Sequence, residues 1–295
     1  MREAKTIDIL LLLLLGIIWG SSFFNIKIAS NSYDPFTLAF VRVVFASIPL
    51  IFLCFYKKIK IQAFSQNWKS YALIGACNIA IPFSLIAIGT SKVDSFLAAM
   101  LMSTTPMSGS ILAHLFTKNE KITLFKSIGI ITGFAGVVFL FLDKLVINES
   151  NLFYALIILA GSTFYSIGGI LTLKIKNQGN ENVTTSTIIW SVIFLLPLSL
   201  IIESPWESSP TLTSTVSLIY LGIIATGAAW LLRFRILTVN GLVFQTQVAY
   251  IIPLVGVIFG YLIMDEVITW KVLVSLFLIV LGIYIVKKNN KGYKK

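Results

Sequence analysis

The sequence predicts an all-α polytopic membrane protein, with ten transmembrane helices arranged as two inverted five-helix repeats. Composition gives the first reason, because hydrophobic residues make up 57% of the 295-residue chain and charged residues only 12%. A soluble domain carries about 25% charged residues, because its surface must face water. The other two reasons are a series of long apolar runs and a weak internal repeat. The chain is therefore expected to lie within a membrane.

The net charge of +11 does not indicate a nucleic-acid partner. A nucleic-acid site needs basic residues gathered on one face of a soluble module. Here the lysines and arginines lie mainly in short gaps between apolar runs, where the positive-inside rule places them. The expected partners are the lipid bilayer and a small-molecule solute, with no nucleic acid.

Ten apolar runs are long enough to cross a bilayer, which requires about 20 mostly apolar residues per helix. The first run follows Arg2 and Lys5 and resembles a signal peptide, but it continues past Phe24 without a small-x-small cleavage site. We therefore expect it to be a retained span. The expected spans are residues 7–27, 36–56, 70–90, 93–117, 122–142, 152–173, 184–202, 215–236, 241–264 and 267–287.

Basic residues predict the orientation, because cytoplasmic segments are enriched in lysine and arginine. With the N-terminus in the cytoplasm, 18 of the 23 basic residues fall on the cytoplasmic side, including Arg233 and Arg235 after the eighth span. Four fall outside, and Arg42 lies within a span. We expect a multi-pass protein of the cell (inner) membrane with both termini cytoplasmic and no loop long enough to form an extramembrane domain.

The two halves share short motifs in the same order, which indicates an internal duplication. The pattern Glu-x-Ile-Thr begins at Glu120 and again at Glu266, before the fifth and tenth spans, where acidic residues suit a helix N-terminus. Each half has five spans, an odd number, so the second half enters the membrane from the opposite side. The expected repeats are residues 1–147 and 148–295. Other matching pairs are Gly20 and Gly161, Pro49 and Pro197, Gly75 and Gly222, and Pro106 and Pro253.

Inverted repeats are typical of secondary transporters, whose site lies near the bilayer midplane between the repeats. Several stretches also resemble one family: GIIWGSSFFNIKIA near the start, an arginine early in the second span, PFSLIAIGTSKVDSFLAAMLMSTTPMSG, and NEKIT followed by GIITGFAGVV. Together they resemble the EamA-like transporter family of the drug/metabolite transporter (DMT) superfamily, over residues 7–287. The resemblance implies a carrier of small organic solutes, with relatives that export amino acids or other metabolites. It also implies a cavity surrounded by spans 1, 3, 4, 6, 8 and 9.

The expected function is secondary, non-ATP transport of small organic metabolites, amino acids or related compounds among them, by alternating access between the repeats. The sequence contains no G-x-x-x-x-G-K-[ST] loop for ATP. Alternatives are a multidrug-type exporter of hydrophobic or cationic compounds and a membrane-embedded enzyme, for which no catalytic cluster is evident. No cofactor or metal is expected, since Cys54 and Cys77 form no ligand motif. Carboxylates fall at span ends or in loops, so coupling through a buried acid is not expected.

Polar and aromatic side chains on the expected inner spans are the candidate substrate-binding residues. Such side chains are poorly suited to face lipid, although hydrogen bonding between helices is an alternative role for each of them. In the first span they recur at three-residue steps, which places them along one slowly drifting stripe of a helix. The candidates are Trp19, Ser22, Asn25, Asn78, Ser103, Thr104, Tyr165, Trp230, Gln245, Gln247 and Tyr250.

Three prolines and one arginine within the spans are further candidates. Proline removes a backbone hydrogen bond and bends a helix, so Pro82, Pro106 and Pro253 are either hinges or static kinks. Arg42 is the one charge deep in an expected span, at a cost of about 2.5–3.5 kcal/mol on insertion scales. It needs a partner, so it serves structure, gating or contact with an anionic group of the substrate.

Small-residue motifs predict close helix packing. Gly-x-x-x-Gly pairs begin at Gly16, Gly129 and Gly256, and such pairs let helix backbones approach one another. We expect them to pack spans within the chain. The alternative is a contact between chains through the peripheral fifth span, so both a monomer and a homodimer are compatible with the sequence.

Overall fold

The computed structural model describes residues 5–116, 122–141, 149–175, 178–240 and 247–288, which form helices and no β-strand. By length and composition, seven helical stretches within these residues are able to cross a membrane: Thr6–Ala29, Pro35–Tyr56, Trp68–Lys92, Ser95–Phe116, Leu152–Thr172, Asn180–Ile202 and Leu212–Arg233. Shorter apolar helices cover Leu124–Leu140, Val248–Met264 and Trp270–Val286. The predicted all-helical fold of a polytopic membrane protein is confirmed for the described residues.

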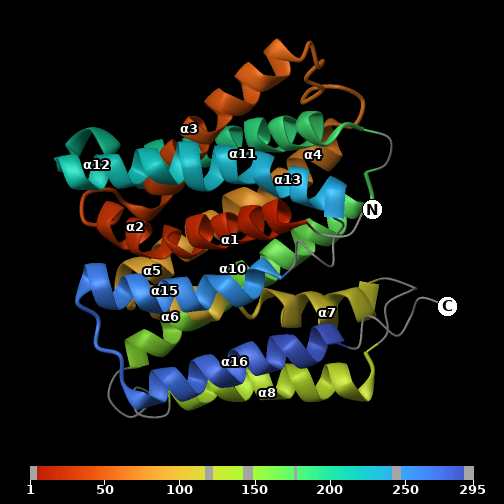
Figure 1. The fold of residues 1–295 in the computed structure, drawn as a ribbon. Coiled ribbons are helices and arrows are strands. Elements are labelled where there is room, and N and C mark those ends of the chain that lie inside the picture. The colour runs from red at the N-terminus through yellow and green to blue at the C-terminus, as the bar shows by residue number, and fades with distance from the viewer. Residues whose placement is uncertain (1–4, 117–121, 142–148, 176–177, 241–246, 289–295) are drawn as a thin grey trace.

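The first half of the chain forms helical stretches that run back and forth across the bundle (Figure 1). Some stretches are interrupted, for example at Ser21 and at Ser103–Thr104. In chain order the elements are α1 (Thr6–Gly20), α2 (Ser22–Ala29), α3 (Pro35–Tyr56), α4 (Trp68–Gly75), the π-helix η1 (Ala76–Ala80), α5 (Ile81–Lys92), α6 (Ser95–Met102), α7 (Thr105–Phe116) and α8 (Leu124–Phe141).

The second half repeats this pattern of long apolar helices. Its elements are α10 (Glu149–Leu173), α11 (Asn180–Ile202), the 3₁₀-helix η2 (Pro205–Glu207), α12 (Leu212–Ile219), the π-helix η3 (Tyr220–Ala228), α13 (Ala229–Asn240), α15 (Val248–Met264) and α16 (Trp270–Lys288). The beginning of α1 and the end of α16 lie at the same end of the bundle (Figure 1).

Two π-helical segments, η1 and η3, lie at corresponding places in the two halves. π-Helices are rare and frequently mark functional sites. A glycine at each segment lets a helix of the other half approach closely. A Cβ added to Gly75, directly before η1, would lie 2.6 Å from the carbonyl oxygen of Thr187 in α11. A Cβ added to Gly222 in η3 would lie 2.3 Å from the Cβ of Phe45 in α3.

The peripheral helices α8 and α16 pack together along one edge of the bundle (Figure 1). Their contact depends on small residues, because a Cβ added to Gly282 would lie 2.6 Å from both the Gly129 carbonyl oxygen and the Gly133 nitrogen. Gly16 meets Ile251 of α15 in the same way, and the motif beginning at Gly256 packs against α6. The expectation that these motifs pack spans within the chain is confirmed.

Two carboxylates cap helix N-termini supplied by the other half of the chain. Glu203, directly after α11, accepts hydrogen bonds from the first-turn N–H groups of α3 at 2.9 and 2.6 Å. Glu266 accepts hydrogen bonds from the backbone N–H groups of Ser95 and Phe96 in α6. A carboxylate suits the partial positive charge of a helix N-terminus. The glutamate of each Glu-x-Ile-Thr motif was expected to suit the N-terminus of the next helix in its own half. Glu266 instead caps α6. Glu120 lies outside the described residues.

Candidate functional site

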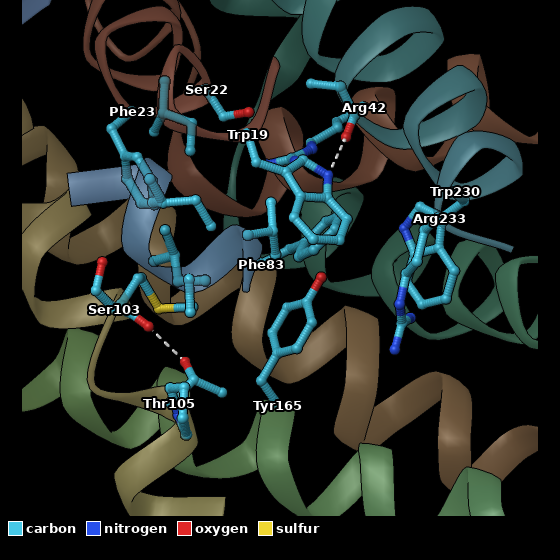
Figure 2. A pocket seen from close by; sticks show the side chains of 18 residues that line it. Trp19, Ser22, Phe23, Arg42, Phe83, Ser103, Thr105, Tyr165, Trp230 and Arg233 are labelled. Carbon is cyan, nitrogen blue, oxygen red and sulfur yellow. Dashed lines mark hydrogen bonds between the residues drawn. The ribbon is translucent and has the colours of Figure 1, made fainter. Parts of the chain in front are cut away.

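A cavity of about 220 Å³ lies between the two halves of the chain. Helices α1 to α3 and α5 to α7 line it from the first half, and α10, η3, α13 and α15 line it from the second. Figure 2 shows Ser103 and Thr105 on one side, Trp230 and Arg233 on the other, and Trp19 and Tyr165 between them. Residues far apart in sequence therefore meet around one cavity.

The break between α1 and α2 directs one face of the first helical stretch toward the cavity. Trp19, Ser22 and Ile26 follow steps of three and four residues, so they share a helix face and line the cavity together. The Trp19 indole Nε1–H donates a hydrogen bond to the carbonyl oxygen of Ala225 at 3.2 Å. Ala225 belongs to η3, so this bond joins the two halves at the cavity wall (Figure 2).

A second break, between α6 and α7, exposes backbone beside the cavity. Pro106 has no backbone N–H, so the carbonyl of Met102 loses its usual helical partner. The Thr105 hydroxyl donates to that carbonyl oxygen and also pairs with the Ser162 hydroxyl at 3.0 Å. The Ser103 hydroxyl donates to the Ala99 carbonyl oxygen at 2.7 Å. The Thr105 hydroxyl thus replaces the missing backbone donor at the Met102 carbonyl oxygen. Both Ser103 and Thr105 line the cavity.

Arg42 is held firmly in the wall formed by α3. Its side chain is only 7% exposed. Its Nε–H donates to the Thr226 hydroxyl at 2.9 Å, and its guanidinium carbon lies 4.0 Å from the centroid of the Phe83 ring. The Thr226 hydroxyl in turn donates to the carbonyl oxygen of Leu221, five residues earlier in η3. The π-helical segment therefore positions the acceptor for Arg42.

Arg233 contributes a second positive charge to the cavity from α13. Its guanidinium carbon lies 4.8 Å from the centroid of the Trp230 ring, one helical turn earlier. Its Nε is buried and has no hydrogen-bond partner among the described residues. Arg233 is thus a cavity-lining cation whose Nε–H has no acceptor among the described residues.

The rest of the cavity wall is apolar and aromatic. Phe83 and Tyr165 are stacked, with ring centroids 6.3 Å apart and an interplanar angle of 26°, and Phe23 and Ile86 add further apolar surface. Among the described residues that line the cavity there is no aspartate or glutamate. The wall therefore combines positive charge, hydroxyl groups and aromatic rings.

The structure brings together several of the residues singled out from the sequence. Those that line the cavity are Trp19, Ser22, Arg42, Ser103, Pro106, Tyr165 and Trp230. For Arg42 the sequence left a structural role, gating and contact with an anionic group open, and the second span is not among those that the family resemblance places around the cavity. Arg42 reaches the cavity because η3 packs closely against α3.

Other candidates do not line this cavity. The Asn25 amide is buried and donates to the carbonyl oxygen of Ser21 on its own helix. Asn78 is buried in η1, where it contacts α10 at Gly168. The Thr104 hydroxyl donates to the carbonyl oxygen of Leu101.

The remaining candidates lie on α5 and near or on α15. Gln247 is exposed directly before α15, and Tyr250 packs against the largest hydrophobic core cluster. Pro82 lies in the first turn of α5, and Pro253 lies inside α15; both are buried. Gln245 lies outside the described residues.

Sequence reasoning missed Arg233 and Phe83 as cavity residues. Arg233 was assigned to the cytoplasmic segment after the eighth span, but α13 continues to Asn240. Seven further helical residues place Arg233 about 10 Å from the helix end, at 1.5 Å per residue. Its position inside the expected span 215–236 is the signal that could have identified it as a cavity candidate.

Comparisons with known proteins agree with this architecture. The family model described as "EamA-like transporter family" matches residues 6–142 and again residues 152–287. "Uncharacterized transporter YoaV" of Bacillus subtilis (strain 168) is 24% identical over 270 residues, covering 91% of this chain and 92% of that protein. "Probable amino-acid metabolite efflux pump" of Escherichia coli (strain K12) is 25% identical over 293 residues, 94% of each chain.

A solved crystal structure shares the fold. It matches with a TM-score of 0.72 at 14% sequence identity, covering 98% of this chain and 100% of that chain. The similar curated proteins are named as transporters rather than as enzymes. The double family match, which covers most of the sequence, shows that the chain belongs to the EamA-like transporter family.

Proposed function

We propose that this chain is a secondary transporter that moves small organic metabolites across the cell (inner) membrane by alternating access. The observation that carries the proposal is the cavity lined jointly by both halves of the chain. Secondary transporters place their substrate site between two repeats, and small relative movements of the repeats open it to either side. The relative named as a probable amino-acid metabolite efflux pump makes amino acids and related compounds the first solutes to test.

The proposed repeats are residues 1–147 and 148–295, related by inversion. Contacts between the halves are reciprocal, which supports the proposal. Helix α3 packs against η3, and α11 packs against α4 and η1; likewise α1 packs against α15, and α10 against α7. The two π-helices occupy matching positions, and the family model matches once in each half.

The proposed topology has ten spans and both termini in the cytoplasm. It predicts that the loop between α15 and α16 faces outward, and that the loop between α3 and α4 faces the cytoplasm. Val267 and Phe64 test this well, because they lie in these loops and are 77% and 71% exposed. After removal of the two native cysteines, an impermeant maleimide applied to intact cells should label V267C and spare F64C. Equal labelling of both sites would overturn the topology.

Transport itself is tested by counterflow in liposomes containing the purified protein. Vesicles preloaded with one amino acid or organic acid at a time should accumulate the same labelled solute from outside. Protein-free vesicles and a Thr105→Phe variant, which places a ring in the cavity, serve as controls. The thermal midpoint of the variant shows whether it still folds. Absence of counterflow across a broad metabolite panel would refute the proposal.

We propose that transport does not depend on a buried acid. Proton- and sodium-coupled carriers usually keep a carboxylate inside a span, whereas the described residues lining this cavity include none. Exchange, facilitated diffusion or another form of coupling then drives the flux. Counterflow that is unchanged when a proton gradient is imposed supports this view, and strict dependence on that gradient contradicts it.

A multidrug-type exporter is the second candidate function. The largely aromatic and aliphatic wall favours hydrophobic compounds. The two arginines disfavour cationic compounds, since like charges repel in a site of low dielectric constant. The same counterflow panel separates the two candidates, because a multidrug exporter accepts uncharged hydrophobic compounds without a preference for metabolites.

A further inference from the structure

The charged side chains among the described residues that line the cavity are both positive. Arg42 and Arg233 both line it, and no aspartate or glutamate is present among its described lining residues. Ionisable residues inside a membrane protein are costly and usually mark a substrate or ion pathway. A cavity with uncompensated positive charge attracts a solute that carries the opposite charge.

The two arginines differ in which of their donors are already used. Arginine binds a carboxylate best through two parallel N–H···O bonds. The Nε–H group of Arg42 is occupied by the Thr226 hydroxyl. The buried Nε of Arg233 has no hydrogen-bond partner among the described residues, and the Arg233 side chain lines the cavity, so its charge is not committed to a described hydrogen-bond acceptor through Nε. Arg42 adds positive charge to the same space.

The aromatic wall and the volume of the cavity indicate the polarity and the size of the solute. Trp19, Phe23 and Phe83 give the cavity an aromatic wall, and Trp230 stacks beside Arg233. The cavity volume of about 220 Å³ is below the 300–1,000 Å³ of typical drug-sized sites. A compact molecule with one anionic group and an apolar or aromatic body satisfies both the charge and the size.

We propose that this site recognises small organic carboxylates with an apolar body, and that Arg233 is the specificity-determining residue. The inference rests on the proposed transport function and names its substrate class. The solute carboxylate pairs with the guanidinium of Arg233, and its apolar part packs against the aromatic wall. Amino acids belong to this class through their carboxylate group.

Three probes with the same aromatic body test the charge preference on the wild-type protein. They are phenylacetate, the neutral phenylacetamide, and the cationic phenethylamine. Isothermal titration calorimetry of the purified protein should show phenylacetate binding at least about tenfold tighter than the amide, because the amide cannot form a charged pair. Phenethylamine should bind more weakly than either. Acid affinity equal to or below that of the amide would overturn the inference.

A pair of variants locates the preference. Arg233→Gln should reduce phenylacetate affinity at least about tenfold and leave phenylacetamide affinity unchanged. Arg235→Gln is the matched control: it removes the same charge from the same helix at an exposed position outside the cavity lining, and it should bind like wild type. Unchanged phenylacetate affinity in Arg233→Gln would overturn the assignment, and thermal midpoints verify that both variants fold.

Failure of this inference and failure of the transport proposal give different results. Tight binding of phenylacetate without counterflow of any solute refutes transport and leaves the carboxylate site intact. Counterflow of the amide or the amine in preference to the acid refutes the carboxylate site and leaves transport intact.

Discussion

Arg42 and Arg233 line the same cavity but occupy different environments. Arg42 is almost fully buried, with its Nε bonded to Thr226 and its guanidinium over Phe83. Arg233 lies beside Trp230, and its buried Nε has no described partner. The same residue type thus serves as part of the wall in one place and as the proposed binding group in the other. The difference is set by which donors the protein already satisfies.

The largest expected effect is on ligand affinity. Arg233→Gln should weaken phenylacetate binding by about 30-fold, because losing one partner of a buried charge pair costs about 2 kcal/mol or more. Arg42→Gln should weaken it only about threefold, since Arg42 contributes charge at longer range. Calorimetric titration of both variants measures the contrast. Equal losses of phenylacetate affinity in the two variants would show that Arg42 and Arg233 do not have different roles in binding.

The next effect is on stability and concerns the partner of Arg42. Thr226→Val removes the hydroxyl acceptor and leaves the Arg42 Nε–H buried without it. Unsatisfied buried donors, particularly charged ones, cost about 1–3 kcal/mol. We expect a loss of about 2 kcal/mol in the free energy of unfolding, measured by denaturation in SDS–detergent mixtures. Thr226→Ser keeps the hydroxyl and should lose less; an equal loss would point to packing rather than to the hydrogen bond.

The third effect has the opposite sign. Arg233→Met removes a charge that has no counter-ion among the described residues, and replacing a buried charge by an apolar side chain of similar length is often stabilising. We expect a gain of about 1 kcal/mol in unfolding free energy, together with loss of carboxylate binding. A variant of lower stability than wild type would show that Arg233 supports the fold.

The smallest effect concerns the ring beside Arg233. Trp230→Leu removes the aromatic face that lies against the guanidinium, a contact typically worth about 0.5–1 kcal/mol or more when desolvated. Phenylacetate affinity should fall about threefold, and the preference for acid over amide should persist. If the variant no longer prefers the acid over the amide, recognition of the carboxylate requires the Trp230 ring as well as Arg233.

The fold class followed from the sequence because a bilayer imposes simple requirements on helix length and polarity. The interruptions within the helical stretches were harder to predict from the sequence. Pro106 predicts the break between α6 and α7, because proline has no backbone N–H to donate to the carbonyl four residues earlier. No proline marks η1 and η3 in this way; the glycines at these segments, Gly75 and Gly222, instead lie against helices that are distant in sequence.

The site was foreseen only in part for a related reason. Trp19 and Ser22 could be placed by helical periodicity alone, and both line the cavity. Asn25 continues the same spacing, but its amide bonds back to the Ser21 carbonyl oxygen and it is not among the lining residues. Arg233 was not among the predicted cavity residues because charge counting groups arginines near a span end with the loop residues. Its environment depends on the length of α13 and on the aromatic wall opposite.

One structural measurement tests the central claim most directly. The protein is crystallised with 4-bromophenylacetate, and the bromine is located by its anomalous scattering. We predict a bromine peak against the aromatic wall near Trp19 and Phe83, with the carboxylate within hydrogen-bonding distance of the Arg233 guanidinium. A ligand bound in the cavity with its carboxylate turned away from Arg233, or a cavity left empty at saturating ligand, would contradict the account.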